Sequence, residues 1–129
     1  MESVDINVEA LKTPIPIDSP EQIMDCASRA EAIGISVAEQ LRVRNEILSG
    51  LSKKRTLQYA SALSEFAGEK VAVAQAKAAE RVSEVDNEIA IEEAHIMYLK
   101  YVGNLVDRRC SLCQSFLSNM TAMAKAGNR

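Results

Sequence analysis

The amino-acid sequence predicts an all-α protein, and three features of it carry that prediction. Aromatic residues make up only 4% of the 129 residues, and there are three Pro and five Gly. A β-sandwich or barrel would need more strand-forming and turn-forming residues than this composition supplies. Good helix formers such as Ala, Leu, Glu and Lys are abundant. Apolar residues recur at alternating spacings of three and four. We therefore expect a single domain over residues 1–129, a long antiparallel helical hairpin with an extended N-terminal arm that oligomerises through its C-terminal helix.

The expected N-terminal arm covers residues 1–18, because Pro14 and Pro16 force the residues before them into extended conformations. A helix then begins after Ser19, which is its predicted cap, with Pro20 at the first helical position and Gln22 three residues after the cap. The sequence leaves open whether the arm packs on its own chain or in the groove of a neighbouring subunit.

The first long helix is expected over residues 19–67. Small and apolar residues repeat along it at spacings of four and three, which places them in one stripe facing one partner helix. The stripe consists of Ala30, Gly34, Val37, Leu41, Leu48 and Leu51, with Arg44 inside it. Gly68 is the expected stop, in the left-handed conformation that ends many helices. Gly50 is a competing break.

The second long helix is expected over residues 69–126, because a seam of similar spacing runs from Ala78 to Ala124 without a proline. A second apolar stripe flanks that seam on the C-terminal half, and one partner helix cannot cover both. We therefore predict that this half packs against other copies of the chain, in a ring or another oligomer whose subunit number stays open. The residues expected in this contact are Ile96, Leu99, Val102, Leu105, Val106, Leu112, Cys113, Phe116, Leu117 and Met120.

Charge is unevenly distributed along the chain, whose formal net charge is −3. Within residues 42–55, five bases stand against one acid, a local +4 that can neutralise phosphates of nucleic acid. The candidate contacts are Arg42, Arg44, Lys53, Lys54 and Arg55. The alternative is a solvated helix face whose field is partly cancelled by acids of the opposite helix. Those acids are Glu84, Asp86, Glu88 and Glu93, and a second basic region is expected from Arg29, Lys100, Arg108 and Arg109.

A turn at Gly68 also sets the register of the two helices. It places Glu92 opposite Arg44, and both residues occupy seam positions. We hypothesise an interhelical ion pair between them that fixes the register rather than adding much stability.

Nothing in the sequence predicts catalysis. Cys110 and Cys113 have the C-x-x-C spacing of redox and zinc sites, but they lie within the helical seam, so we expect them to be packed in the core as reduced thiols, like Cys26. Glu92 and His95 have the Glu-x-x-His spacing of di-metal bundles, and a second chain would have to complete the ligands. Phosphate-binding loops and nucleophile elbows are absent. We expect no enzyme activity, no metal and no cofactor.

The chain is expected to be cytoplasmic and without membrane contact. Residues 1–12 lack the positively charged start and apolar core of a signal peptide, and no apolar run is long enough to span a membrane. Three cysteines, an odd number, do not suggest a disulfide framework.

Several short stretches occur in an order and spacing that resemble one known family. They are Glu9-Ala10-Leu11-Lys12, Ile17-Asp18-Ser19, Lys53-Lys54, Leu63 with Phe66-Ala67-Gly68, Val85-Asp86, and the region of Leu105, Asp107 and Cys110. In these, and over most of its length, the chain resembles the UvsY recombination mediators of T-even phages. The resemblance implies a helical protein that forms rings and has no catalysis of its own. It also implies binding of single-stranded DNA, contacts with a RecA-like phage recombinase and with a single-strand-binding protein, and loading of the former as the latter is displaced.

The DNA contacts of that family carry over only to Lys53 and Lys54, with Arg55 beside them. Where the family has further basic residues, this chain has the uncharged residues 58–62. Tyr59 is a candidate for stacking on a base, as aromatic side chains do in other single-strand binders, and a core position is its alternative.

The function expected from the sequence is therefore a recombination mediator that binds single-stranded DNA and helps to load a recombinase, in the host cytoplasm if the protein is phage-encoded. A structural coiled-coil assembly or adaptor protein without nucleic-acid binding is the first alternative. An oligomeric ferritin-like di-metal bundle that uses Glu92 and His95 is the second.

Overall fold

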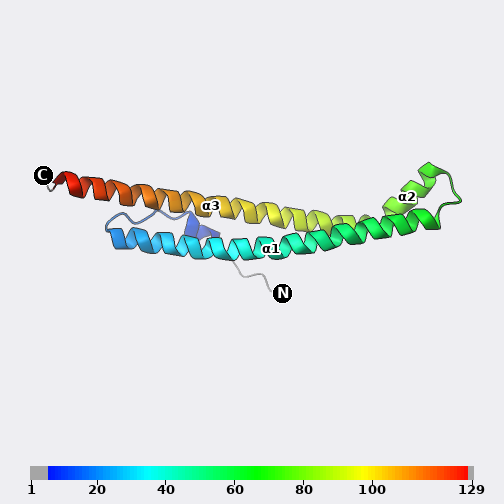
Figure 1. Ribbon diagram of the computed structural model, residues 1–129, viewed down its shortest axis with the longest axis horizontal. Helices are drawn as coiled ribbons and strands as arrows, with labels where there is room; N and C mark the ends of the chain where they lie inside the picture. Colours follow the sequence, from blue (N-terminus) through cyan, green and yellow to red (C-terminus); the bar gives the residue numbers. More distant parts are fainter. Residues whose placement is uncertain (1–5, 128–129) are drawn as a thin grey trace. The chain divides into compact units, whose positions relative to one another are not determined.

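The computed structural model describes residues 6–127, which form helices and no strand. The elements are a short 3-10 helix, η1 (Val8–Leu11), followed by α1 (Pro20–Glu65), α2 (Val71–Arg81) and α3 (Ser83–Gly127), as Figure 1 shows. The all-α class is confirmed. The first part of the predicted arm, residues 1–5, lies outside the described residues.

The start of α1 is the one that the sequence predicts. Pro20 is its first residue, and the N–H of Gln22 donates to Ser19 Oγ at 3.3 Å. The hydroxyl therefore satisfies one of the amide groups that the first helical turn leaves without a partner.

The predicted end of α1 is only partly right. The helix ends at Glu65 and the chain turns through the following residues, but Gly68 does not have a positive φ, so the left-handed stop is wrong. Instead, the N–H of Ala67 donates to Ser64 O at 3.3 Å and that of Glu69 to Phe66 O at 3.0 Å. These tight turns satisfy the last carbonyls with negative φ throughout. The competing break at Gly50 is also wrong, because Gly50 lies inside α1.

The second helix is interrupted at Val82, where one helix over residues 69–126 was expected. Val82 has φ −99° and ψ 4°, and it separates α2 from α3. The Ser83 hydroxyl donates to Glu80 O at 2.8 Å, which competes locally with the helical pattern. Val82 is fully buried, and helical hydrogen bonds continue on both sides of it, from Val82 N–H to Ala78 O at 3.2 Å and from Asp86 N–H to Val82 O at 2.8 Å, so the interruption is local.

The helices form two compact units. The terminal unit contains residues 6–41 and 99–127 of the described chain, and the central unit contains residues 42–98. In each, a stretch of α1 lies beside a stretch of α3 that runs in the opposite direction (Figure 1).

Small residues bring the helices of the terminal unit close together. A Cβ on Gly34 would lie 3.1 Å from Val106 Cγ1, and one on Gly103 would lie 3.7 Å from Val37 Cγ1. The arm adds a third layer, because Leu11 is buried in the same core. The buried members of this core are Leu11, Ala30, Val37, Leu99, Val102 and Val106, and a second cluster consists of Ile23, Cys26 and Cys113.

The central unit has a thinner core that rests largely on alanine. Its buried residues are Ala62, Ala74, Ala78, Val82, Val85 and Ile96. At its turn the Phe66 ring lies beneath two cations, Lys77 at 5.0 Å and Arg81 at 5.4 Å from the ring centroid. Both cations also pair with carboxylates of this region, so charge and ring together hold α2 against the end of α1.

The residues predicted to contact other copies are mostly buried within the chain itself. Ile96 is buried in the central unit, and four others are buried in the terminal unit: Leu99, Val102, Val106 and Cys113. Leu105, Phe116, Leu117 and Met120 are partly buried against the two clusters of the terminal unit, and Leu112 is 51% exposed. The two apolar stripes on this half of α3 predict a second packing partner besides α1, and the arm is part of that partner. Oligomerisation stays a prediction.

None of the helices that residues 6–127 form has an apolar stretch long enough to cross a lipid bilayer.

Candidate nucleic-acid interface

Lys53 and Lys54 are consecutive, exposed residues of α1 in the central unit. Neither forms an ion pair within 4 Å with any carboxylate among residues 6–127. Their ammonium groups therefore remain available to an anionic ligand.

Arg55 and Tyr59 lie one helical turn apart on α1 and contact each other. The Arg55 guanidinium lies 5.6 Å from the centroid of the Tyr59 ring and also pairs with Asp86 of α3. The hydrogen bond to Asp86 is the main reason why the pKa of Arg55 is raised above its usual value. Tyr59 is half-buried, so it is not a core residue, and its ring is not fully open for a base to stack on.

Arg42 and Arg44 are both engaged within the chain. Arg42 Nη1 donates to Glu46 Oε1 at 2.7 Å along the exposed surface of α1. Arg44 Nη1 donates to Glu92 Oε1 at 2.9 Å across to α3, which confirms the interhelical pair that the register predicts. To bind phosphate, either arginine would have to exchange a carboxylate for it.

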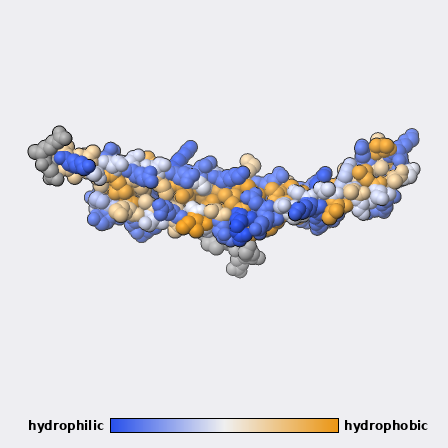
Figure 2. Space-filling model, in the orientation of Figure 1, coloured by the Kyte–Doolittle hydropathy of each residue, from blue (hydrophilic) through white to orange (hydrophobic). Residues whose placement is uncertain are grey.

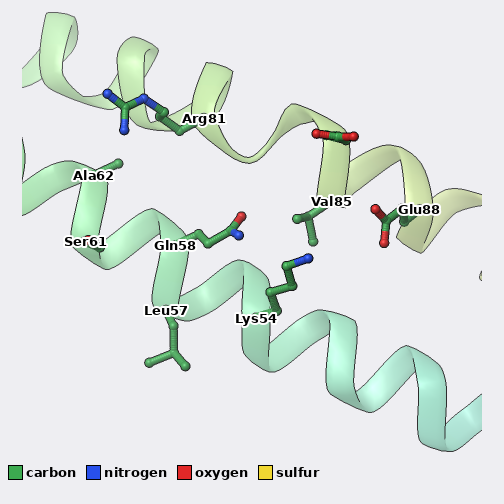
Figure 3. Close-up of a pocket in the computed structure, with 9 residues that line it drawn as sticks. Lys54, Leu57, Gln58, Ser61, Ala62, Arg81, Val85 and Glu88 are labelled. Carbon is green, nitrogen blue, oxygen red and sulfur yellow. The ribbon is translucent and has the colours of Figure 1, made fainter.

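A hollow of about 520 Å³ lies between α1 and the following helices, next to Lys54. Figure 3 shows the Lys54 ammonium extending toward α3, on the side of Val85 and Glu88, whereas Leu57 points away. Glu84 and Glu88 both line this hollow. These acids, with Asp86 on Arg55, lower the positive potential as the sequence predicts, while Glu93 is exposed.

The second predicted basic region is divided by the fold. Arg109 is only 8% exposed and donates to Leu11 O at 3.1 Å, to Thr13 O at 2.6 Å and to Thr13 Oγ1 at 3.3 Å. It therefore holds the arm and does not face solvent as expected. Arg29 pairs with Asp25 at 3.1 Å, whereas Lys100 and Arg108 are exposed.

The cysteines are packed thiols, as predicted. Cys26 and Cys113 lie in one buried cluster, and all three cysteines are free. Burial raises the pKa of the Cys110 and Cys113 thiols above the usual value, and Cys26 adds to the shift at Cys113. Such thiols are poor nucleophiles at neutral pH.

The two predicted metal ligands do not converge with others. The Glu92 carboxylate accepts from Arg44, and His95 is exposed. Within residues 6–127 no three His, Cys, Asp or Glu side chains gather as a metal site would require. Among the described residues, Glu92 and His95 thus lack the further ligands that a di-metal centre needs.

Compared with protein-family models, with curated proteins and with solved structures, the chain matches none of them. Each unit pairs a stretch of α1 with an antiparallel stretch of α3, and the turn that joins α1 to α2 belongs to the central unit.

Sequence reasoning missed one residue with a clear structural task, Arg109. Its partners are backbone carbonyls of an arm without periodicity, and no pattern of side chains marks such acceptors. The arginine next to Cys110 in an otherwise apolar seam was the available signal.

Proposed function

We propose that the protein is an accessory protein that binds single-stranded DNA, of the recombination-mediator class. The observation that supports this proposal is the exposure of Lys53 and Lys54 on α1, neither of which pairs with a carboxylate among residues 6–127. The nearby Arg55 and Tyr59 offer a cation and a ring, the two groups that single-strand binders combine. Binding to a RecA-like recombinase and to a single-strand-binding protein, and action in the cytoplasm, rest on the resemblance to the phage family.

The mechanism is electrostatic and independent of base sequence. The two lysines displace counterions that are condensed on the DNA phosphates, so affinity falls as salt rises. Arg55 also binds a DNA phosphate when that phosphate replaces the exposed carboxylate of Asp86. This exchange costs little free energy because exposed ion pairs are weak. Assembly into an oligomer would repeat this small patch and multiply its weak contacts.

The test is fluorescence anisotropy of a labelled oligo(dT) titrated with protein at several salt concentrations, with a duplex alongside. The Lys53→Glu, Lys54→Glu double variant should lose at least about tenfold in affinity, and its slope of log K against log salt should fall by about 1.4 if two phosphate contacts disappear. A separate Tyr59→Leu variant should also bind oligo(dT) more weakly than the parent if the ring stacks on a base.

The matched control is the Lys70→Glu, Lys125→Glu double variant, which makes the same change in net charge at exposed positions elsewhere. It should retain the affinity of the parent. Equal losses in both variants, or no binding by the parent at low salt, would overturn the proposal.

A helical adaptor without nucleic-acid affinity is the second candidate. It is favoured by one observation, the pairing of Arg42, Arg44 and Arg55 with carboxylates of the same chain. An adaptor would assemble normally and show no salt-dependent binding of oligo(dT) in the same titration.

A further inference from the structure

The terminal unit contains an open groove between the arm and α3, here called the arm groove, with a volume of about 580 Å³. One wall is the segment that runs from Leu11, the last residue of η1, to Ile17, and the other is the face of α3 around Leu112. In Figure 2, hydrophobic surface alternates with hydrophilic surface in the part of the molecule where the arm lies along α3. The volume is in the range of sites that hold a few side chains of a ligand.

Large apolar side chains of the arm groove remain in contact with solvent. Ile17 is 55% exposed on the arm and Leu112 is 51% exposed on α3, while Ile15 and Phe116 are half-buried. Exposed apolar groups on two facing walls bury more surface with a ligand between them than either wall buries alone.

The charges around the arm groove are all of one sign. Lys12, Arg108 and Arg109 line it, and no acidic residue among residues 6–127 does. Arg109 is occupied by the arm carbonyls, and Lys12 has a weak contact with the exposed Glu9 at 4.0 Å. Arg108 is exposed and forms no ion pair with the described residues. Its neighbour Asp107 lines a separate hollow on the adjoining face of α3, which Arg108 and Leu112 also border.

We propose that the arm groove binds an acidic peptide segment of a partner protein, whose aliphatic or aromatic side chains pack on Ile17 and Leu112 while its carboxylates pair with Arg108 and Lys12. Charge complementarity selects this partner, because an apolar floor with a cationic rim fits a segment that carries both features. A peptide fits better than nucleic acid, because the floor is aliphatic and its one ring, Phe116, is half-buried.

Arg109 makes the arm groove a preformed site. Two of its hydrogen bonds hold the arm backbone at Leu11 O and Thr13 O and a third holds the Thr13 hydroxyl, so one wall does not have to be ordered when the peptide binds. The inference does not depend on DNA binding, since Lys53 and Lys54 belong to the central unit.

The test uses the full chain and a labelled synthetic peptide in which aspartates flank leucine and phenylalanine, followed by fluorescence anisotropy. Two comparison peptides separate the parts of the recognition, one with asparagine for each aspartate and one with serine for each apolar residue. Arg108→Glu should weaken binding of the acidic peptide by about tenfold or more, and Leu112→Ser by several-fold. Lys125→Glu, an exposed substitution on α3 outside the groove, should leave it unchanged.

Both groove variants alter exposed side chains, so helix content and melting temperature should match the parent and show that the fold is intact. A Kd above about 1 mM for the acidic peptide would overturn the proposal. Equal binding of the asparagine peptide would also overturn it, and so would an Arg108→Glu variant that loses oligo(dT) but keeps the peptide. A change of oligomeric state in Leu112→Ser without any loss of peptide binding would assign the groove to a second copy of the chain instead.

Discussion

Arg44 and Glu92 join α1 and α3 of the central unit through an ion pair that satisfies only half of the carboxylate. Glu92 Oε1 accepts from Arg44 at 2.9 Å, whereas Oε2 is buried without a hydrogen-bond partner among the described residues. The side chains are 21% and 12% exposed, so neither is fully solvated. A pair in this position gains little net stability, because desolvation offsets much of the attraction.

Replacing Arg44 by Leu alone should lower the free energy of unfolding by about 1–3 kcal/mol, since it leaves Glu92 with a charge and no partner. The Arg44→Leu, Glu92→Leu double variant should return to within about 1 kcal/mol of the parent, because two apolar side chains suit the seam. Urea denaturation measures both. Arg29→Leu, which breaks an exposed pair with Asp25, is the control and should cost less than about 0.5 kcal/mol. A double variant as unstable as the single one would contradict the account.

Two glycines of α1 offer a matched comparison. Gly50 has nothing within 4 Å of an added Cβ, so Gly50→Ala should stabilise the protein by about 0.5–1 kcal/mol through helix propensity alone. At Gly34 the new Cβ would lie 3.1 Å from Val106 Cγ1, and a buried β-branched side chain has little freedom to move.

Gly34→Ala should therefore show no gain, and should fall at least about 0.5 kcal/mol below Gly50→Ala in free energy of unfolding. Thermal and urea melts of the two single variants, side by side, decide this. Equal stabilisation by both would mean that the helices of the terminal unit can separate slightly at no cost.

The sequence predicts those parts of the fold that local residue patterns mark, and it misses those that no local pattern marks. Ser19 and Pro20 mark a helix start by local chemistry, and the pairing of Arg44 with Glu92 follows from a turn near Gly68 and a regular seam. The break at Val82 carries no such mark, because the apolar spacing continues through it and neither Gly nor Pro is present. A hydrogen bond from the Ser83 hydroxyl to Glu80 O accompanies the break, but a single serine in a helical pattern does not by itself predict one.

The candidate interface shows the same division. The sequence identifies Lys53 and Lys54, whose exposure follows from their charge, and it anticipates that opposing acids weaken the patch. The arm groove could not be predicted, because it depends on the path of an aperiodic segment that Arg109 holds through backbone carbonyls.

The raised pKa values of two cysteine thiols should make the free energy of unfolding depend on pH. The pKa values of Cys110 and Cys113 are raised in the folded chain, chiefly by burial. The unfolded thiols ionise above about pH 8.5, where the folded ones remain neutral. Their contribution to stability is therefore complete below that pH and is lost as the pH rises through the folded pKa values.

The free energy of unfolding should accordingly decline above about pH 8.5. The Cys110→Ala, Cys113→Ala double variant is the comparison, and its decline between about pH 8.5 and 10 should be shallower, whatever its absolute stability. Urea denaturation at a series of pH values gives both slopes. Parallel slopes would show that other groups account for the alkaline loss.

Arg109 ties the arm to α3, and its removal should release the arm rather than unfold the helices. Arg109→Ala leaves the carbonyls of Leu11 and Thr13 without their charged donor and should cost about 1.5–3 kcal/mol. Arg109→Lys should recover only part of this, because one ammonium group cannot reproduce both nitrogens of the planar fork, of which Nη1 contacts the two carbonyls and Nη2 contacts Thr13 Oγ1. The exposed neighbour Arg108→Ala is the control, with an expected change within about 0.5 kcal/mol.

Hydrogen exchange separates release of the arm from global unfolding. In Arg109→Ala, the amides of Ala10 and Lys12, which donate to Asn7 Oδ1 and to Glu9 O, should exchange faster, whereas amides in the middle of α1 should keep their protection. Uniform acceleration along the chain would instead mean that the arm is integral to the core, through the buried Leu11, and that Arg109 stabilises the terminal unit as a whole.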